Sequence, residues 1–151
     1  MERLSQEIER AVAAALAEDA ADADETTRLL VPRSSRGRAE IIALAPGVIS
    51  GQLCAAAVFD RLGGDVRYEP AVPDSGAVAA GERVASLEGP LGMILSGERT
   101  AMNFLCHLSG IATLTSRFVA RVEGTGVRML DTRKTTPGLR YLEKMAVFHG
   151  G

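Results

Sequence analysis

The feature that most constrains the fold of this chain is the stretch VRMLDTRKTTPGLRYLEKMAV, residues 127–147. It begins with VRML, a short run that is apolar on both faces, and a strand without a polar face is normally buried between layers, as in a parallel sheet. The chain then turns polar and basic over residues 131–136, here called the polar segment, and continues as an amphipathic helix over 139–147. A buried strand, a polar tip and a helix are parts of an α/β unit, so this stretch predicts the start of a β/α layer.

The chain before this stretch predicts an α+β domain up to about residue 110. Apolar residues at helical spacing predict helices over 3–18, 52–64, 96–110 and 111–123, with Ser96 as an N-cap and Gly110 as a C-cap. Alternating residues between Pro and Gly turns predict strands over 38–51, broken at Pro46, and β-hairpins over 65–90. The acidic residues 17–27 are expected to form a solvated connection, and Thr26 and Thr27 to enter a short strand.

Composition excludes several classes of protein. The formal charge of −2 and a pI of about 5.7 argue against a nucleic-acid coat or a polybasic membrane anchor. No apolar run reaches the ~18 residues of a membrane span, and the N-terminus MERLSQEIER is too charged for a signal peptide. The two cysteines, Cys54 and Cys106, lie far apart and fit a reducing compartment. We therefore expect a soluble cytoplasmic protein with neither nucleic acid nor a membrane as its partner.

The polar segment carries groups that bind anions. In β/α architectures functional groups gather at the carboxyl ends of strands, which is where this segment is expected. Arg133 offers a planar fork of donors, Lys134 offers a point charge, and threonines add hydroxyls. Thr136, Pro137 and Gly138 are typical of a helix start, whose free backbone N–H groups favour a second anion. The alternative is a solvated helix start in which Asp131 pairs with a neighbouring cation and nothing binds.

Several motifs resemble one enzyme family. Residues 97–147, GERTAMNFLCHLSGIATLTSRFVARVEGTGVRMLDTRKTTPGLRYLEKMAV, closely resemble quinolinate phosphoribosyltransferase, also called nicotinate-nucleotide diphosphorylase (carboxylating). Upstream, AALAEDAADADETT, APGVISG and VPDSGAVAAGERVASLEGP resemble the N-terminal domain of that family. The resemblance implies an α/β sandwich of helices and antiparallel strands over 1–110. It implies that 111–151 form the start of the C-terminal α/β barrel, namely its first strand and helix.

The resemblance also implies a reaction in NAD biosynthesis. Quinolinate attacks C1 of phosphoribosyl pyrophosphate through its ring nitrogen, pyrophosphate leaves, and loss of carbon dioxide gives nicotinate mononucleotide. Mg²⁺ accompanies the pyrophosphate, with its ligands expected outside these residues. Both substrates are polyanions, which agrees with a site built from Arg and Lys.

Four residues match the substrate-binding residues of the family. Thr132, Arg133 and Lys134 match its TRK motif, and Arg99 matches an arginine that one subunit of a homodimer delivers to the active site of the other. A cation in the first turn of a helix opposes the helix dipole, which a bound anion at Arg99 would explain. No residue is assigned a catalytic role and no metal ligand is expected. Other polar residues are expected to be packed, solvated or orienting groups: Glu98, Asn103, His107, Asp131, Glu143 and Lys144.

The family continues beyond the motifs found here, so the sequence is expected to be an N-terminal fragment. One parallel strand cannot satisfy its two edges or bury two apolar faces. We therefore expect the 151-residue chain alone to be marginally stable, prone to association and nearly inactive.

Two alternatives stay open on the sequence. One is a related phosphoribosyltransferase-like protein associated with molybdate transport, and the other is a non-catalytic dimerisation partner that lends Arg99 to an intact copy. The stretch DSGAVAAGERVASLEG also resembles biotinyl and lipoyl carriers, but no lysine precedes Lys134 to carry such a cofactor.

Overall fold

The computed structural model describes residues 2–19, 24–63 and 65–151, so part of the expected acidic connection lies outside the described residues. Within them the predicted α+β class is confirmed, because helices are combined with antiparallel strands. The elements in chain order are α1 (Glu2–Glu18), α2 (Glu25–Leu30), β1 (Arg36–Ile42), β2 (Gly47–Val48), α3 (Gln52–Arg61), β3 (Arg67–Pro70), β4 (Ala77–Val78), β5 (Arg83–Pro90), α4 (Leu91–Val122) and α5 (Arg140–His149).

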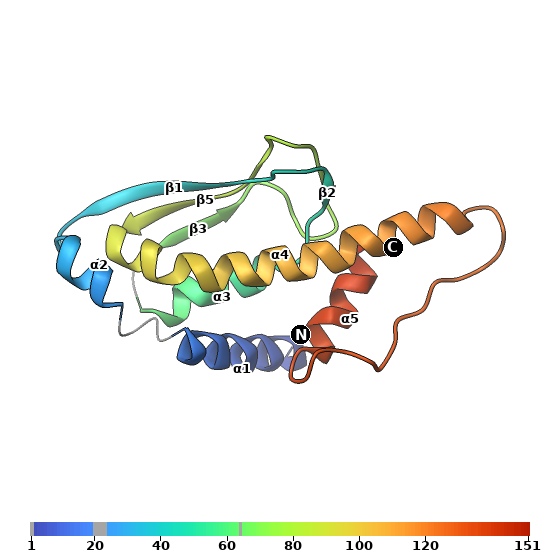
Figure 1. Ribbon diagram of the computed structural model, residues 1–151, viewed down its shortest axis with the longest axis horizontal. Coiled ribbons are helices and arrows are strands. Elements are labelled where there is room, and N and C mark those ends of the chain that lie inside the picture. The colour runs from blue at the N-terminus through green and yellow to red at the C-terminus, as the bar shows by residue number, and fades with distance from the viewer. Residues whose placement is uncertain (1, 20–23, 64) are drawn as a thin grey trace.

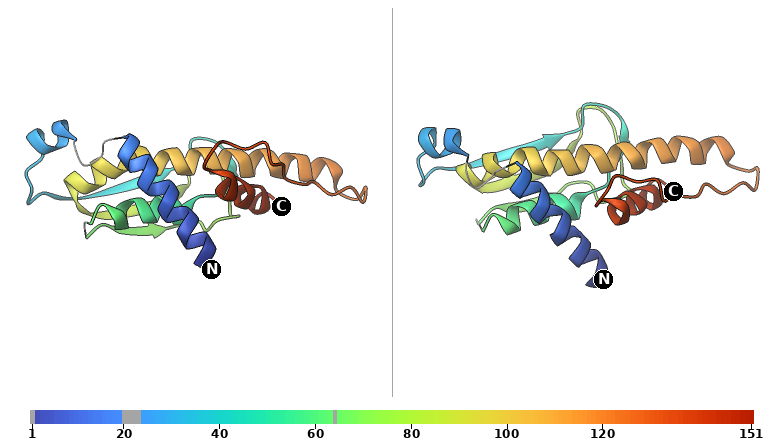
Figure 2. Two further views of the ribbon diagram at one scale, coloured as in Figure 1. Left: turned by 90° about the horizontal axis from the view of Figure 1, so that it is seen from below. Right: turned by 60° about the horizontal axis from the view of Figure 1, so that its bottom comes forward.

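The strands form two antiparallel groups. The larger sheet has the order β1-β5-β3, with Arg36 opposite Pro90 and Tyr68 opposite Leu87, and the smaller pairs β2 with β4. The sheet, the pair α3 and α4, and then α1 follow one another as layers (Figure 1). Seen from below, α1 crosses the long helix α4 obliquely (Figure 2). The main core lies between these layers.

Apolar spacing explains the helices that cover the sheet. In α1, the buried residues Ile8, Ala11, Val12 and Leu16 recur at helical spacing and face α3 and α4. Helix α3 begins after Gly51, which has φ +108°, and a Cβ there would lie 3.2 Å from the carbonyl oxygen of Phe104 on α4. A glycine at this position therefore permits both the left-handed backbone and the close approach of the two helices.

Helix α4 corrects the expectation of two helices. It runs unbroken for 32 residues, so Ser96 is not an N-cap and Gly110 is not a C-cap. The buried positions of α4 continue in phase from Ile94 through Leu108 to Ala112, and this apolar stripe outweighs one unfavourable glycine. Despite this length, none of the helices within 2–19, 24–63 and 65–151 is both long and apolar enough to cross a membrane.

The strand expected at Thr26 and Thr27 is wrong, because these residues belong to α2. The backbone N–H of Thr27 donates to the Asp24 carboxylate at 3.0 Å, which caps this short helix. The local N-cap therefore outweighs the β-propensity of two threonines.

The expected buried strand over 127–130 is also absent from the structure. Residues 123–139 connect α4 to α5 without helix or strand, and the exposed fractions of Val127 and Leu130 are 59% and 81%. No strand within the described residues lies alongside them to supply hydrogen bonds, and a single strand is not stable without a neighbour. The helix that follows starts at Arg140, after a turn in which the Leu139 N–H donates to the Thr136 carbonyl.

Candidate functional site

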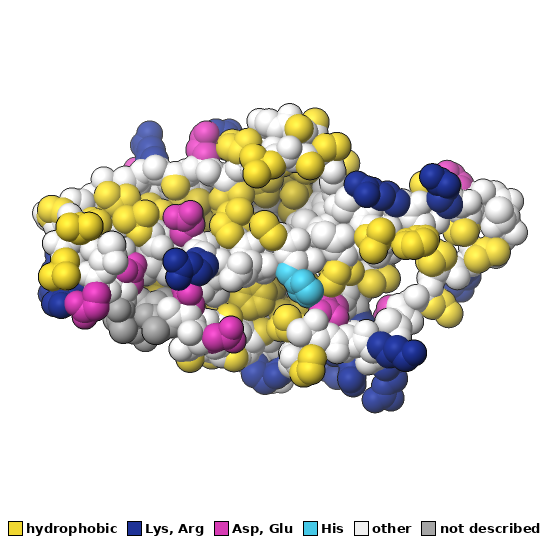
Figure 3. Space-filling model, in the orientation of Figure 1, with side chains coloured by type: hydrophobic (Ala, Val, Ile, Leu, Met, Phe, Trp, Pro, Cys, Tyr) yellow, Lys and Arg dark blue, Asp and Glu magenta, His cyan; other side chains and the backbone are white. Residues whose placement is uncertain are grey.

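The polar segment lies against α5 and the start of α1, beside an open cleft. The cleft has a volume of about 800 Å³. Its polar and charged lining comprises Arg3, Glu7, Arg10, Arg133, Thr135, Thr136, Arg140, Tyr141 and Lys144. Five of these side chains are cations and one is a carboxylate, so we call it the basic cleft. Lys and Arg side chains gather in this region at the lower right of Figure 3, near the start of α1 and the polar segment.

Contacts within the basic cleft already use part of this charge. Arg10 donates to the Glu7 carboxylate at 2.7 Å and to the Gly138 carbonyl at 2.8 Å, and so ties α1 to the turn before α5. Arg3 lies over the ring of Tyr141, 5.4 Å from its centroid. Within the described residues, Arg133 makes no ion pair. The guanidinium of Arg133 is therefore available to a ligand with carboxylate or phosphate oxygens.

The structure places the predicted binding residues of the TRK motif together. Thr132, Arg133 and Lys134 are all exposed, and the Lys134 N–H donates to the Thr132 hydroxyl at 3.1 Å. Arg133 lines the basic cleft. The alternative in which Asp131 pairs with Arg133 or Lys134 is wrong, because Asp131 pairs instead with Lys144 on α5 at 2.9 Å. The cations of the motif are therefore not neutralised by the carboxylate beside them.

Arg99 lies apart from this segment. It projects from α4 eight residues before His107, which corresponds to about 12 Å along a helix. Its side chain is 75% exposed, and its guanidinium pairs with Asp19 at 3.0 Å. Because α4 begins at Leu91, Arg99 does not lie in the first turn of a helix, and the argument from the helix dipole is wrong.

A second groove, of about 530 Å³, extends from Asp19, the partner of Arg99, to residues that also line the basic cleft. It runs between α1 and α4, from Asp19 and Thr100 to Thr136 and Gly138. Thr100 is 2% exposed, and its hydroxyl is the one buried side-chain polar atom without a hydrogen-bond partner among the described residues.

Glu143 is the functional candidate that the sequence interpretation missed. Its side chain was expected on a solvated helix face, yet the residue is only 8% exposed. One carboxylate oxygen accepts from the backbone N–H of Thr136 at 3.2 Å, and the other lies 2.9 Å from Nε2 of His107. A sequence signal existed, because Glu143 falls in the stripe of Leu139, Leu142 and Ala146 that faces the core.

The electrostatics of Glu143 follow from this environment. Burial raises the pKa of the carboxyl group, but the hydrogen bonds from Thr136 and from His107 outweigh it and hold the pKa below its ordinary value of 4.5. Glu143 is therefore a carboxylate at neutral pH. Since a carboxylate oxygen only accepts, His107 donates from Nε2, which fixes the position of that proton.

The Thr136 contact corrects the prediction of free N–H groups at a helix start. The Thr136 N–H is occupied by Glu143, and helix α5 begins four residues later, at Arg140. The anion at this backbone donor is thus supplied by the chain itself.

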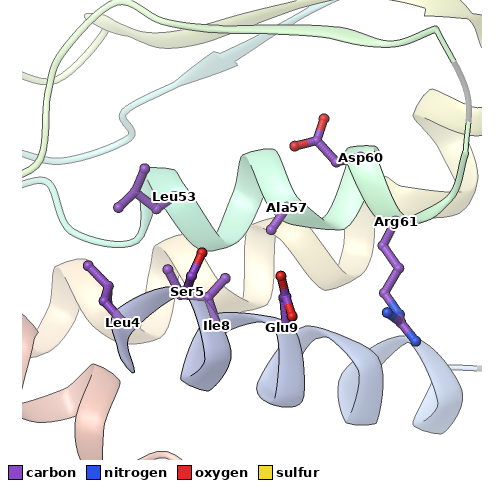
Figure 4. Close-up of a pocket in the computed structure, with 8 residues that line it drawn as sticks. All are labelled: Leu4, Ser5, Ile8, Glu9, Leu53, Ala57, Asp60 and Arg61. Carbon is purple, nitrogen blue, oxygen red and sulfur yellow. The ribbon is translucent and has the colours of Figure 1, made fainter. Parts of the chain in front are cut away.

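A further groove lies between α1 and α3, away from all predicted binding residues (Figure 4). It is lined by Leu4, Ser5, Ile8, Glu9, Leu53, Ala57, Asp60 and Arg61. Asp60 points away from α1, so the charged groups do not converge on one point. This groove offers no arrangement for chemistry, and its exposed Glu9 is a useful control position.

Comparisons with known proteins cover nearly the whole chain. A family model for the N-terminal domain of quinolinate phosphoribosyl transferase matches residues 24–109, and one for the C-terminal domain matches residues 111–151. The junction of the two matches falls inside the continuous helix α4.

Individual relatives agree with these matches. A Synechocystis protein named probable nicotinate-nucleotide pyrophosphorylase (carboxylating) is 43% identical over 136 residues, which cover 90% of this chain and 46% of the relative. A Mycobacterium leprae protein of the same name, without "probable", is 38% identical over 130 residues, covering 85% of this chain and 46% of the relative. The solved nicotinate-nucleotide pyrophosphorylase of Francisella tularensis matches with a TM-score of 0.91 at 35% identity, covering 97% of this chain and 52% of that chain. The chain spans about half the length of the relatives that it matches.

Proposed function

This chain belongs to the quinolinate phosphoribosyl transferase family, and from that membership we propose that it takes part in phosphoribosyl transfer to quinolinate. In this reaction the ring nitrogen of quinolinate forms a bond to C1 of phosphoribosyl pyrophosphate as the bond from C1 to the pyrophosphate oxygen breaks. The carboxylate next to the ring nitrogen then leaves as carbon dioxide, and the ring carbon takes up a proton from water in its place, so the products are nicotinate mononucleotide, carbon dioxide and pyrophosphate. The alternative of a molybdate-associated paralogue is not favoured by the relatives, which carry the pyrophosphorylase name.

The observation that supports this proposal most is that Arg133 lines the basic cleft and makes no ion pair with another described residue. A pyridine dicarboxylate presents two carboxylates, and a guanidinium binds a carboxylate through two parallel hydrogen bonds. Lys134 adds a compact charge suited to a phosphate, and the Thr132 hydroxyl adds a polar contact. Thr132, Arg133 and Lys134 are thus our proposed substrate-binding residues. They act by binding and orienting two anions that would otherwise repel each other.

Arg99 is proposed to act on the site of a second subunit. In its ion pair with Asp19 the Arg99 side chain is 75% exposed, although that of Asp19 is only 21% exposed. Water screens the Arg99 end of this pair, so a substrate anion can compete with Asp19 for the guanidinium. A homodimer with shared sites is also supported by an apolar groove along α4 and the β1–β2 connection. Leu44 and Leu114 line this groove and are 93% and 55% exposed. Phe118, one turn after Leu114 on α4, is 52% exposed.

Mg²⁺ is proposed to arrive with phosphoribosyl pyrophosphate. Within 2–19, 24–63 and 65–151, no three acidic, histidine or cysteine side chains lie close enough together to hold a metal ion. No step of the reaction is assigned to a metal ion held by these residues. A cytoplasmic location and low turnover of the 151-residue chain alone also stay predictions.

Calorimetric titration of the chain with quinolinate tests this function. We expect binding that weakens about tenfold or more in Arg133→Ala, because a charge-assisted pair is lost. Arg67→Ala is the matched control, since Arg67 is an exposed arginine on β3 that pairs with Glu69, and it should leave the affinity unchanged. Equal affinity in wild type and Arg133→Ala would refute the assignment. Carbon dioxide release in the presence of both substrates measures turnover in the same preparation.

A further inference from the structure

Helix α5 holds both ends of the polar segment. At the first end, Lys144 pairs with Asp131 at 2.9 Å. At the other end, Glu143 accepts from the Thr136 N–H at 3.2 Å. The residues between these anchors, 132–135, have neither helix nor strand structure to fix their shape.

The two anchors differ in strength. The side chains of Lys144 and Asp131 are 42% and 34% exposed, so water and salt screen their attraction. The Glu143 side chain is 11% exposed. A hydrogen bond to an ionised group is strong where water is excluded, and loss of one partner leaves the other unsatisfied. Glu143 is therefore the dominant anchor.

His107 connects this anchor to the core. It projects from α4, the long helix that packs against α3 and the sheet, and its Nε2 lies 2.9 Å from the second oxygen of Glu143. The carboxylate thus spans two elements, with α4 on one side and Thr136 on the other. Both oxygens already make a contact within the protein, and the residue is only 8% exposed, which argues for a structural task at the site and against a chemical one.

We propose that Glu143, held by His107, is a positioning residue that fixes the anion-binding segment Thr132–Thr136 in its binding shape. This inference rests on the proposed function, since it assigns Glu143 a task in binding the same anion. Glu143 touches no substrate. It acts by removing motion from the backbone that carries Arg133 and Lys134, so that less conformational freedom is lost when an anion binds.

Two measurements on the chain test the proposal together: hydrogen exchange of the Thr136 amide and the quinolinate affinity. In Glu143→Ala, we expect exchange at Thr136 and the quinolinate Kd both to rise by about tenfold or more, since one charge-assisted hydrogen bond is lost. Glu143→Gln keeps an acceptor oxygen for the Thr136 N–H. Its Thr136 exchange rate and its quinolinate Kd should therefore lie between those of wild type and Glu143→Ala, which is the rescue that a positioning role requires. Glu9→Gln removes the same charge from the groove of Figure 4 and should change neither quantity.

The outcomes separate this inference from the proposed function. If Thr136 exchanges faster in Glu143→Ala but quinolinate binds as in wild type, the positioning role is overturned and the function stands. If the wild-type chain binds no quinolinate, the function fails and the inference fails with it. If Glu143→Ala does not fold, Glu143→Gln decides: a rise in both quantities supports the role, and no change in either overturns it.

Discussion

Replacing Gly110 by alanine tests the continuity of α4 most directly. Gly110 lies inside this helix, is exposed, and has no atom within 4 Å of an added Cβ. Alanine is more favourable than glycine in a helix interior by about 0.8–1.0 kcal/mol. We expect Gly110→Ala to raise the free energy of unfolding by about 0.5–1 kcal/mol. For a chain of this size, each kcal/mol raises the melting temperature by about 2–4 °C.

Gly97→Ala is the matched control in the same helix. The helix propensity gained is the same, but a Cβ at Gly97 would lie 2.6 Å from Cε1 of Phe59 and 3.0 Å from Cδ1 of Leu62. Phe59 is 1% exposed and belongs to the main core, and overpacking of a core costs about 1–3 kcal/mol. Gly97→Ala should therefore lower stability.

Urea unfolding followed by circular dichroism measures both variants. The structure requires opposite signs, positive for Gly110→Ala and negative for Gly97→Ala. If Gly110 were a left-handed C-cap, as its sequence context predicts, alanine there would lower stability by about 1 kcal/mol or more. A loss of that size in Gly110→Ala would refute the continuous helix.

Four further predictions concern single groups. Thr100→Val should raise the free energy of unfolding by about 1 kcal/mol, because it removes a buried hydroxyl without a partner. Ser50→Ala should lower the free energy of unfolding by a similar amount, because the buried Ser50 hydroxyl lies 2.8 Å from Nδ1 of His149 and this hydrogen bond is lost. The pKa of Glu143 is lower in the folded chain than its ordinary value of 4.5. The stabilisation that the Glu143 carboxylate gives to the folded state is therefore complete above pH 4.5 and is lost as the pH falls below the pKa of the folded chain. The difference in unfolding free energy between wild type and Glu143→Gln should shrink on acidification, and a constant difference would contradict this. Leu130→Ser should change stability by less than about 0.5 kcal/mol, because Leu130 is 81% exposed, and a thermal-unfolding loss several times larger would mean that the expected strand forms in solution.

Local signals account for the elements that the sequence predicted correctly. Helix α1 could be predicted because its apolar residues recur at one spacing over 17 residues, and the break between β1 and β2 because Pro46 and Gly47 interrupt alternation. The prediction of two helices in place of α4 is wrong because Gly110 is typical of a helix C-terminus only when the residues on each side of it are considered separately. Its buried stripe is decided by packing against α3, which is a tertiary effect that no local rule contains.

The candidate site shows the same division. The three residues of the TRK motif could be predicted from residue type, and the structure places them together on an exposed segment. Glu143 could not be assigned by type, since an exposed glutamate is the ordinary expectation on a helix that starts at a surface. Only its place in the apolar stripe, together with the position of His107 on another helix, identifies it as an anchor.

The physical basis of the site therefore differs from the one that the sequence suggested. The sequence predicts the polar segment at the carboxyl end of a buried strand, yet in the structure residues 127–130 before it form no strand. The polar segment is held instead by side chains of the helices beside it. These are Glu143 and Lys144 of α5, and Arg10 of α1, which donates to the Gly138 carbonyl. Because α5 is itself fixed at its far end by the contact between His149 and Ser50, the polar segment is held by helices already packed on the core. The contacts that hold this segment thus come from α1 and α5, while Arg133 and Lys134, the residues proposed to bind the anion, remain exposed.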